Sequence, residues 1–106
     1  MTKLYVAKFR YGEPRLARVE LERKTPKLYI VKHGTKEALL GYIHIGNRLH
    51  RERDHCFFTG QEAIEYLLDE VNKHIADLEY QIEKAEGAKK ELGMVLNTLV
   101  NEQERA

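Results

Sequence analysis

Residues 57–68, FFTGQEAIEYLL, separate two different sequence patterns and decide the predicted fold. Thr59 is a favourable helix N-cap residue, and Glu62 follows it by three positions. In this Thr-x-x-Glu capping box, the hydroxyl accepts a hydrogen bond from a first-turn N–H and the carboxylate reaches back toward the cap. The pattern predicts that a helix begins at Gly60.

Beyond Thr59, apolar residues, with one lysine among them, recur in an unbroken alternation of four and three positions. This spacing is the a/d repeat of a coiled coil. We therefore expect one long helix in residues 59–106, which forms a homodimer with a second copy. Higher oligomers and both helix orientations remain open, because the seam mixes Ile, Leu and Val. This seam consists of Ile64, Leu68, Val71, Ile75, Leu78, Ile82, Ala85, Lys89, Leu92, Leu96 and Leu99.

Gly87 offers an alternative, in which the helix breaks and folds back as a monomeric hairpin. The seam, however, keeps its phase through Gly87, which takes a solvent-facing position where glycine costs only ~1 kcal/mol. No Pro, Asn, Asp or Ser directly follows to cap a second helix. The sequence favours one continuous helix, interrupted in its apolar seam only by Lys89.

Upstream of Phe57, five short runs alternate with period two, which is typical of β-strands. Gly, Pro and Asn separate them, and Gly41 inside the fourth run indicates a bulge or bend. We predict an α+β fold in which a small antiparallel curled sheet or partly open barrel of about five strands (1–58) precedes the coiled-coil helix, as one structural unit. The predicted strands are 3–11, 15–23, 27–33, 38–45 and 48–58.

Size and composition fit one small domain. The chain has 106 residues, of which 42% are hydrophobic and 33% charged. The single cysteine, Cys56, allows no intrachain disulfide, and the N-terminus has no long apolar core. These features predict a cytoplasmic protein that does not enter the membrane.

Charge is distributed unevenly along the chain. Residues 1–56 hold 13 basic and 6 acidic side chains, whereas residues 57–106 hold 5 and 11. The basic half is suited to anions such as nucleic acids or nucleotides. Alternatively, the two halves attract each other, within one chain or between copies.

The stretch RLHRERDHC (48–56) gathers three arginines, two histidines and Cys56. Zinc sites need four ligands at paired spacings, which this stretch lacks. Cys56 precedes two phenylalanines and is expected in the core rather than as a nucleophile. Since phosphate-loop, dinucleotide and nucleophile-elbow motifs are also lacking, we expect no catalytic residue, metal or cofactor, and no enzymatic activity.

Anion binding is the more favourable interpretation of this stretch. As one strand, it would place Arg51, Arg53 and His55 on one face and its acids on the other. Tyr5, Tyr11, Tyr29 and Tyr42 are candidates for base stacking, or else core residues. The candidate binding residues are Lys8, Arg10, Arg48, Arg51, Arg53 and His55.

The order of features resembles that of small, mostly uncharacterised phage and prophage proteins with an N-terminal β-meander and a C-terminal helix. The resemblance is carried by TPKLYIVK (25–32), by the basic fifth strand, and by Phe58-Thr59 with Glu62-Ala63. It implies a binding role, such as inhibition of a host or defence factor or sequestration of a ligand. It transfers no functional residue.

From these patterns we expect a non-catalytic, homodimeric interaction protein with a protein partner, of the phage-inhibitor type. The alternative is a nucleic-acid- or nucleotide-binding module that uses the basic β-half. Residues expected to mediate oligomerisation are Leu68, Val71, Ile75, Leu78, Ile82, Lys89, Leu92, Leu96 and Leu99.

Overall fold

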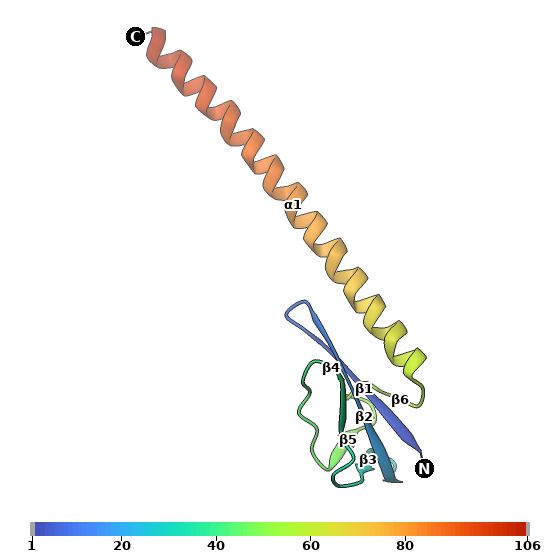
Figure 1. Cartoon of the computed structure of the whole chain (residues 1–106). Helices are drawn as coiled ribbons and strands as arrows, with labels where there is room; N and C mark the ends of the chain where they lie inside the picture. The colour runs from blue at the N-terminus through green and yellow to red at the C-terminus, as the bar shows by residue number, and fades with distance from the viewer. Residues whose placement is uncertain (1, 106) are drawn as a thin grey trace. The chain divides into compact units, whose positions relative to one another are not determined.

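The computed structural model describes residues 2–105 and contains six strands followed by one helix (Figure 1). This arrangement confirms the predicted α+β class. The elements are β1 (Lys3–Arg10), β2 (Glu13–Lys24), β3 (Leu28–Val31), β4 (Glu37–Leu40), β5 (Arg48–His50), β6 (Cys56–Phe57) and α1 (Gly60–Arg105).

The long strand β2 organises an antiparallel sheet. It pairs with β1 along one edge and shares its other edge between β4, near Leu16–Arg18, and β3, near Leu21–Lys24. The sheet order is β5-β3-β2-β1-β6, with β4 off this path. Because the order ends at β5 and β6, the sheet is open and is not a closed barrel. Of the two predicted forms, this is the antiparallel sheet.

A two-residue turn at Tyr11 and Gly12 joins β1 to β2. Both residues have positive φ, 54° and 76°, which is the conformation of a type I′ hairpin turn. The predicted turn at 12–14 is therefore displaced: Tyr11 leaves the strand, and Pro14 joins β2 opposite Phe9. The alternation could not show this, because tyrosine is common in strands and rare at positive φ.

The third and fourth strands are shorter than predicted. The fourth ends at Leu40, where the chain bends at Gly41 with a φ of 63°. A Cβ atom at Gly41 would lie 3.2 Å from Cγ of Arg15, so both space and conformation favour glycine. The predicted bend is thus present, and it ends the strand. Ile43 is buried within the irregular segment that follows.

The single strand predicted for 48–58 is wrong. This stretch instead forms two short strands, β5 and β6, with a turn between them. Strand β5 pairs with β3, and β6 pairs with β1. Nδ1 of His50 accepts hydrogen bonds from the backbone N–H groups of Glu52 and Arg53, each at 3.2 Å. Oδ2 of Asp54 accepts one from the N–H of His50 at 2.6 Å. These side chains stabilise the turn, so one alternation of faces cannot hold across 48–58.

Both faces of the sheet are covered in its central strands. One apolar cluster is formed by Leu4, Val6, Val19, Tyr29, Val31 and Leu49. The second joins Ala7 and Leu16 of the sheet to Ala63 and Leu67 of α1. Neighbouring residues Val6 and Ala7 are therefore both fully buried, on opposite sides of β1.

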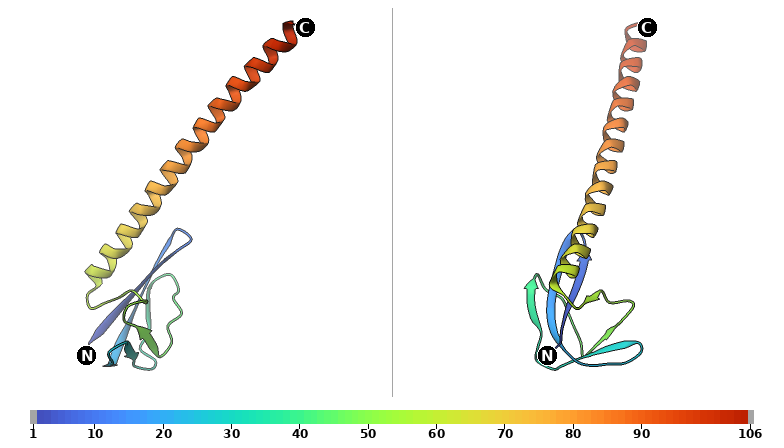
Figure 2. Two further views of the ribbon diagram at one scale, coloured as in Figure 1. Left: turned by 180° about the vertical axis from the view of Figure 1, so that it is seen from behind. Right: turned by 90° about the vertical axis from the view of Figure 1, so that its right-hand side faces the viewer.

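The helix begins at Gly60, as predicted. Oγ1 of Thr59 accepts a hydrogen bond from the N–H of Glu62 at 3.2 Å and donates one to Oε1 of Glu62 at 3.0 Å. The helix is continuous through Gly87, where an added Cβ would meet no other atom within 4 Å (Figure 2). The hairpin alternative is excluded. The chain forms two compact units, and the first ends at Asn72. The first turns of α1 therefore belong to the same unit as the sheet.

Candidate functional surfaces

The first turns of α1 carry two different apolar faces. Ala63 and Leu67, which are 0% and 4% exposed, pack on the sheet together with Tyr66. The seam residues Ile64 and Leu68 each follow one position later, about 100° around the helix, and are 42% and 56% exposed. The face that holds the helix on the sheet is therefore not the seam.

Beyond Lys73 the seam continues along the helix surface. Its large apolar side chains are 44–70% exposed, and Lys89 is exposed among them. A long stripe of exposed apolar side chains is typical of an interface rather than of a monomer's surface. The exposed members in this part are Ile75, Leu78, Ile82, Leu92, Leu96 and Leu99.

Four of the six predicted binding residues line one cleft of about 260 Å³, here called the β1 cleft. It lies where β1 extends past its short partner β6, which pairs only with Tyr5 and Val6. Sequence reasoning missed three further lining residues, although Tyr66 was detectable in a second helical stripe with Ala63. The lining residues are Lys8, Phe9, Arg10, Arg53, Asp54, His55 and Tyr66.

His55 is held in place at both its backbone and its ring. Its carbonyl accepts a hydrogen bond from the N–H of Ala7 at 3.0 Å, which continues the β1–β6 pairing by one residue. Its imidazole stacks on the ring of Tyr66 with centroids 4.4 Å apart and planes inclined by 24°. Phe57 packs on the same tyrosine at 5.5 Å. Because His55 is exposed, its ring forms the outer layer of this stack.

The cations of the β1 cleft are not neutralised within the part of the chain that the structure describes. None of the ion pairs found there includes Lys8, Arg10 or Arg53. Asp54, the one acid in the lining, accepts a hydrogen bond from the His50 N–H within the turn. The cleft therefore carries a surplus of positive charge.

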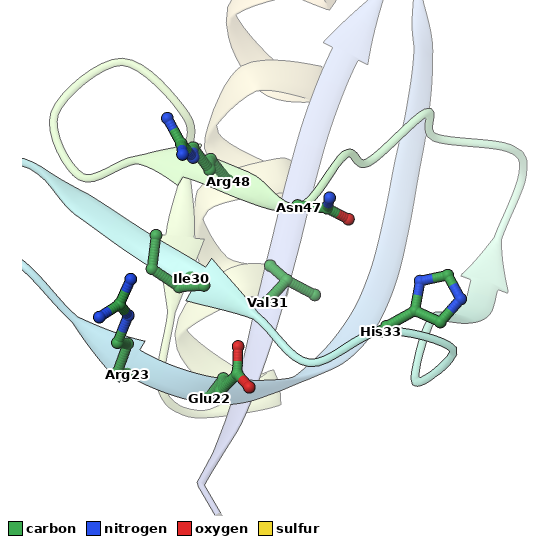
Figure 3. A pocket seen from close by; sticks show the side chains of 7 residues that line it. All are labelled: Glu22, Arg23, Ile30, Val31, His33, Asn47 and Arg48. Atoms are coloured by element: carbon green, nitrogen blue, oxygen red, sulfur yellow. The ribbon is translucent and has the colours of Figure 1, made fainter.

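Arg48 lies elsewhere, in a larger pocket of about 550 Å³ on the sheet, here called the sheet-face pocket. Strand register places Arg23, Ile30 and Arg48 in one row across β2, β3 and β5. Figure 3 shows Ile30 between Arg48 and Arg23, with Val31, Asn47 and His33 farther along the sheet. The carboxylate of Glu22 also lines this pocket, so its two cations are partly balanced.

Arg51 has a structural role. Its Nη1 donates a hydrogen bond to the carbonyl of Thr25 at 2.8 Å, and its guanidinium lies 5.1 Å from the ring centroid of Tyr29. The backbone N–H of Arg51 donates to the carbonyl of Lys27 at 2.9 Å. These contacts attach the 51–54 turn to the loop before β3. The predicted binding residues thus separate into three locations.

Cys56 packs against the first apolar cluster, opposite Val6. Burial, and secondarily the charge of Asp54, raises the pKa of its thiol to about 12. The thiol is therefore protonated at neutral pH and is a poor nucleophile. Among residues 2–105, no group of three or more His, Cys, Asp or Glu side chains is placed to hold a metal ion.

Comparison of the chain with protein-family models, with curated proteins and with solved structures finds no match. The resemblance to phage proteins therefore stays a prediction. Within the described residues, no helix has the length and apolar character needed to cross a membrane.

Proposed function

We infer that the protein is a non-catalytic interaction protein that self-associates through α1 and presents its β-module (residues 1–58) for binding. The observation that carries this proposal is the uncovered seam on a continuous 46-residue helix. An isolated helix of this kind gains most of its stability from packing an apolar face. A second copy supplies a face of the same length and repeat.

The residues beside the seam favour a parallel, in-register pair. In that arrangement, a flanking residue of one helix faces the flanking residue five positions later on the other. His74 then meets the partner's Glu79, and Val95 meets the partner's Val100. These two pairs match a polar flank with a polar flank and an apolar flank with an apolar flank.

An antiparallel pair aligned over its full length matches these flanks poorly. Glu79 would face the partner's Glu86, and this contact between like charges would occur twice. Val95 would face the partner's His74. Lys89 opposes the parallel arrangement, because it would lie beside its own copy in the seam. A single charged residue at such a position fixes register at some cost in stability.

The test is the molar mass in solution by light scattering, with Leu92 and Met94 as a matched pair. Both side chains are 70% exposed, but only Leu92 lies in the seam. Leu92→Asp should convert the oligomer to a monomer over a wide concentration range, whereas Met94→Asp should leave it associated. A wild-type monomer at high concentration would refute self-association.

Orientation is tested with single cysteines in a Cys56→Ser background. Gln103 takes a seam position near the end of the helix. Gln103→Cys should form a disulfide with its own copy under mild oxidation if the pair is parallel. Gln61→Cys should behave in the same way at the other end. Disulfides that form only between the two variants when mixed would establish the antiparallel pair.

The phage-type inhibitor role, the cytoplasmic location and a protein partner complete this proposal. The β-module supports a binding role because it presents concave surfaces and charged residues on a buried core. A parallel pair would place two β-modules at the same end of the helices and allow bivalent contact. Inhibition of an isolated host enzyme by the wild-type protein, and weaker inhibition by Leu92→Asp, is the expected result.

A further inference from the structure

We propose that the β1 cleft binds the nucleotide unit of a single-stranded nucleic acid. Its three cations contact the phosphates, and a base stacks on His55. The residues of this cleft lie outside the seam, so the proposal does not depend on self-association.

The cations converge from two separate segments. Lys8 and Arg10 lie at the end of β1, and Arg53 lies on the 51–54 turn. The turn is fixed by the side chains of His50 and Asp54, so the backbone of Arg53 is held beside the cleft before any ligand arrives. Cations without internal ion pairs are suited to phosphate oxygens because no existing ion pair has to be broken on binding.

The aromatic wall supplies the second part of the recognition. His55, Tyr66 and Phe57 form a layered stack that is anchored in the second apolar cluster. The exposed imidazole at its outer edge is a platform on which a base can extend the stack. Stacking platforms beside cationic grooves are the common means of binding single strands without base-specific contacts.

A single strand fits this geometry better than a duplex. The cleft is small, about 260 Å³, and its platform lies inside it rather than on an extended face. In a duplex the flat faces of the bases are stacked on each other and cannot reach such a platform. A free mononucleotide carries the same phosphate and base. The experiment must therefore distinguish a single strand from a free mononucleotide as the ligand.

The experiment measures fluorescence anisotropy of a short labelled oligothymidylate with the full chain, across a range of salt concentrations. Three phosphate contacts on a single strand predict a slope of log K against log salt of about −2. The double variant Arg10→Ala with Arg53→Ala should reduce that slope to about −0.7. His55→Ala should weaken binding about ten-fold and leave the slope unchanged.

Arg48→Ala is the matched control, because it removes one positive charge from the same module but from the sheet-face pocket. It should change neither the affinity nor the slope appreciably. An equal loss in Arg48→Ala would overturn the proposal, since diffuse attraction to the basic half would then explain binding. Absence of binding at low salt, or equal affinity for a duplex, would also overturn it.

Unlabelled adenosine monophosphate, added as a competitor, separates the two sources of the ligand. Much tighter binding of the oligonucleotide identifies a single strand. Equal affinity of the two identifies a free nucleotide and supports the same site chemistry. Both outcomes require that His55→Ala weakens binding of the ligand concerned.

Discussion

The sheet unit and the helix beyond Asn72 use their apolar residues in opposite ways. In the sheet unit, the central strands bury side chains on both faces, and the first turns of α1 complete the second cluster. Beyond Asn72, the large apolar seam residues remain exposed. The first unit packs its apolar residues within one chain, whereas the second exposes an apolar repeat that no other described residue covers.

The largest expected effects come from two adjacent leucines that belong to the two systems. Leu67 is 4% exposed and packs on the sheet, whereas Leu68 is 56% exposed and lies in the seam. Leu67→Ala should lower the free energy of unfolding of the sheet unit by about 2–4 kcal/mol, because it leaves a cavity in the second cluster. Denaturant titration followed by tyrosine fluorescence measures this loss.

Leu68→Ala is the control for that comparison. It should barely change the unfolding of the sheet unit, and it should shift the concentration at which the chain associates. If both substitutions destabilise the sheet unit equally, the two faces of α1 are not functionally separate.

Lys89 provides a test of the seam in the helix beyond Asn72. Lys89→Leu completes the seam, so it should stabilise the associated state by about 2 kcal/mol, the scale for burying one leucine side chain. Helical circular dichroism during heating, at several concentrations, measures this gain. The adjacent Lys90 lies off the seam, so Lys90→Leu should produce no such shift. A lower melting temperature for Lys89→Leu would show that Lys89 makes favourable contacts in the assembly.

Sequence patterns predicted the helix better than the sheet, and the reason is physical. The cap at Thr59 and the repeat from Ile64 to Leu99 act through local geometry, which the sequence contains directly. The 48–58 stretch instead depends on His50 and Asp54, whose side chains bond to the backbone of a turn. Such bonds compete with strand pairing, and period-two alternation cannot detect them.

The candidate site shows the same limit. Lys8 and Arg53 are far apart in sequence and meet because β6 pairs with β1. Composition could identify the basic half but not the separation of Arg48 and Arg51 from the β1 cleft. That separation follows from the strand order, in which β5 and β6 lie at opposite ends of the sheet.

The cap at Thr59 lies at the start of α1, within the sheet unit, and should have an intermediate effect. Thr59→Ala removes the acceptor for the Glu62 N–H and should cost about 1 kcal/mol. Thr98 is the control, because its hydroxyl only donates to the carbonyl of Met94 within the helix. Thr98→Ala should be nearly neutral. Equal effects of the two substitutions on tyrosine-detected unfolding would show that the cap does not stabilise the sheet unit.

The smallest effect at neutral pH, visible only in alkali, should come from Cys56. Its pKa is raised from 9.0 to about 12, chiefly by burial, so the folded state favours the protonated thiol. That contribution to stability is complete below pH 9 and is lost progressively as pH rises toward 12. Cys56→Ala should therefore lose less stability than the wild type over this interval, in denaturant titrations at stepped pH.

Comparison between the two proteins cancels the ionisation of tyrosines and lysines, which they share. The difference should appear in tyrosine fluorescence of the sheet unit and not in the melting of the helix beyond Asn72, because the single cysteine lies in the sheet unit. Parallel alkaline curves for wild type and Cys56→Ala would mean that the thiol is not protected by the fold. Because the half-buried thiol packs against the first apolar cluster, such a result would also contradict the burial of the thiol there.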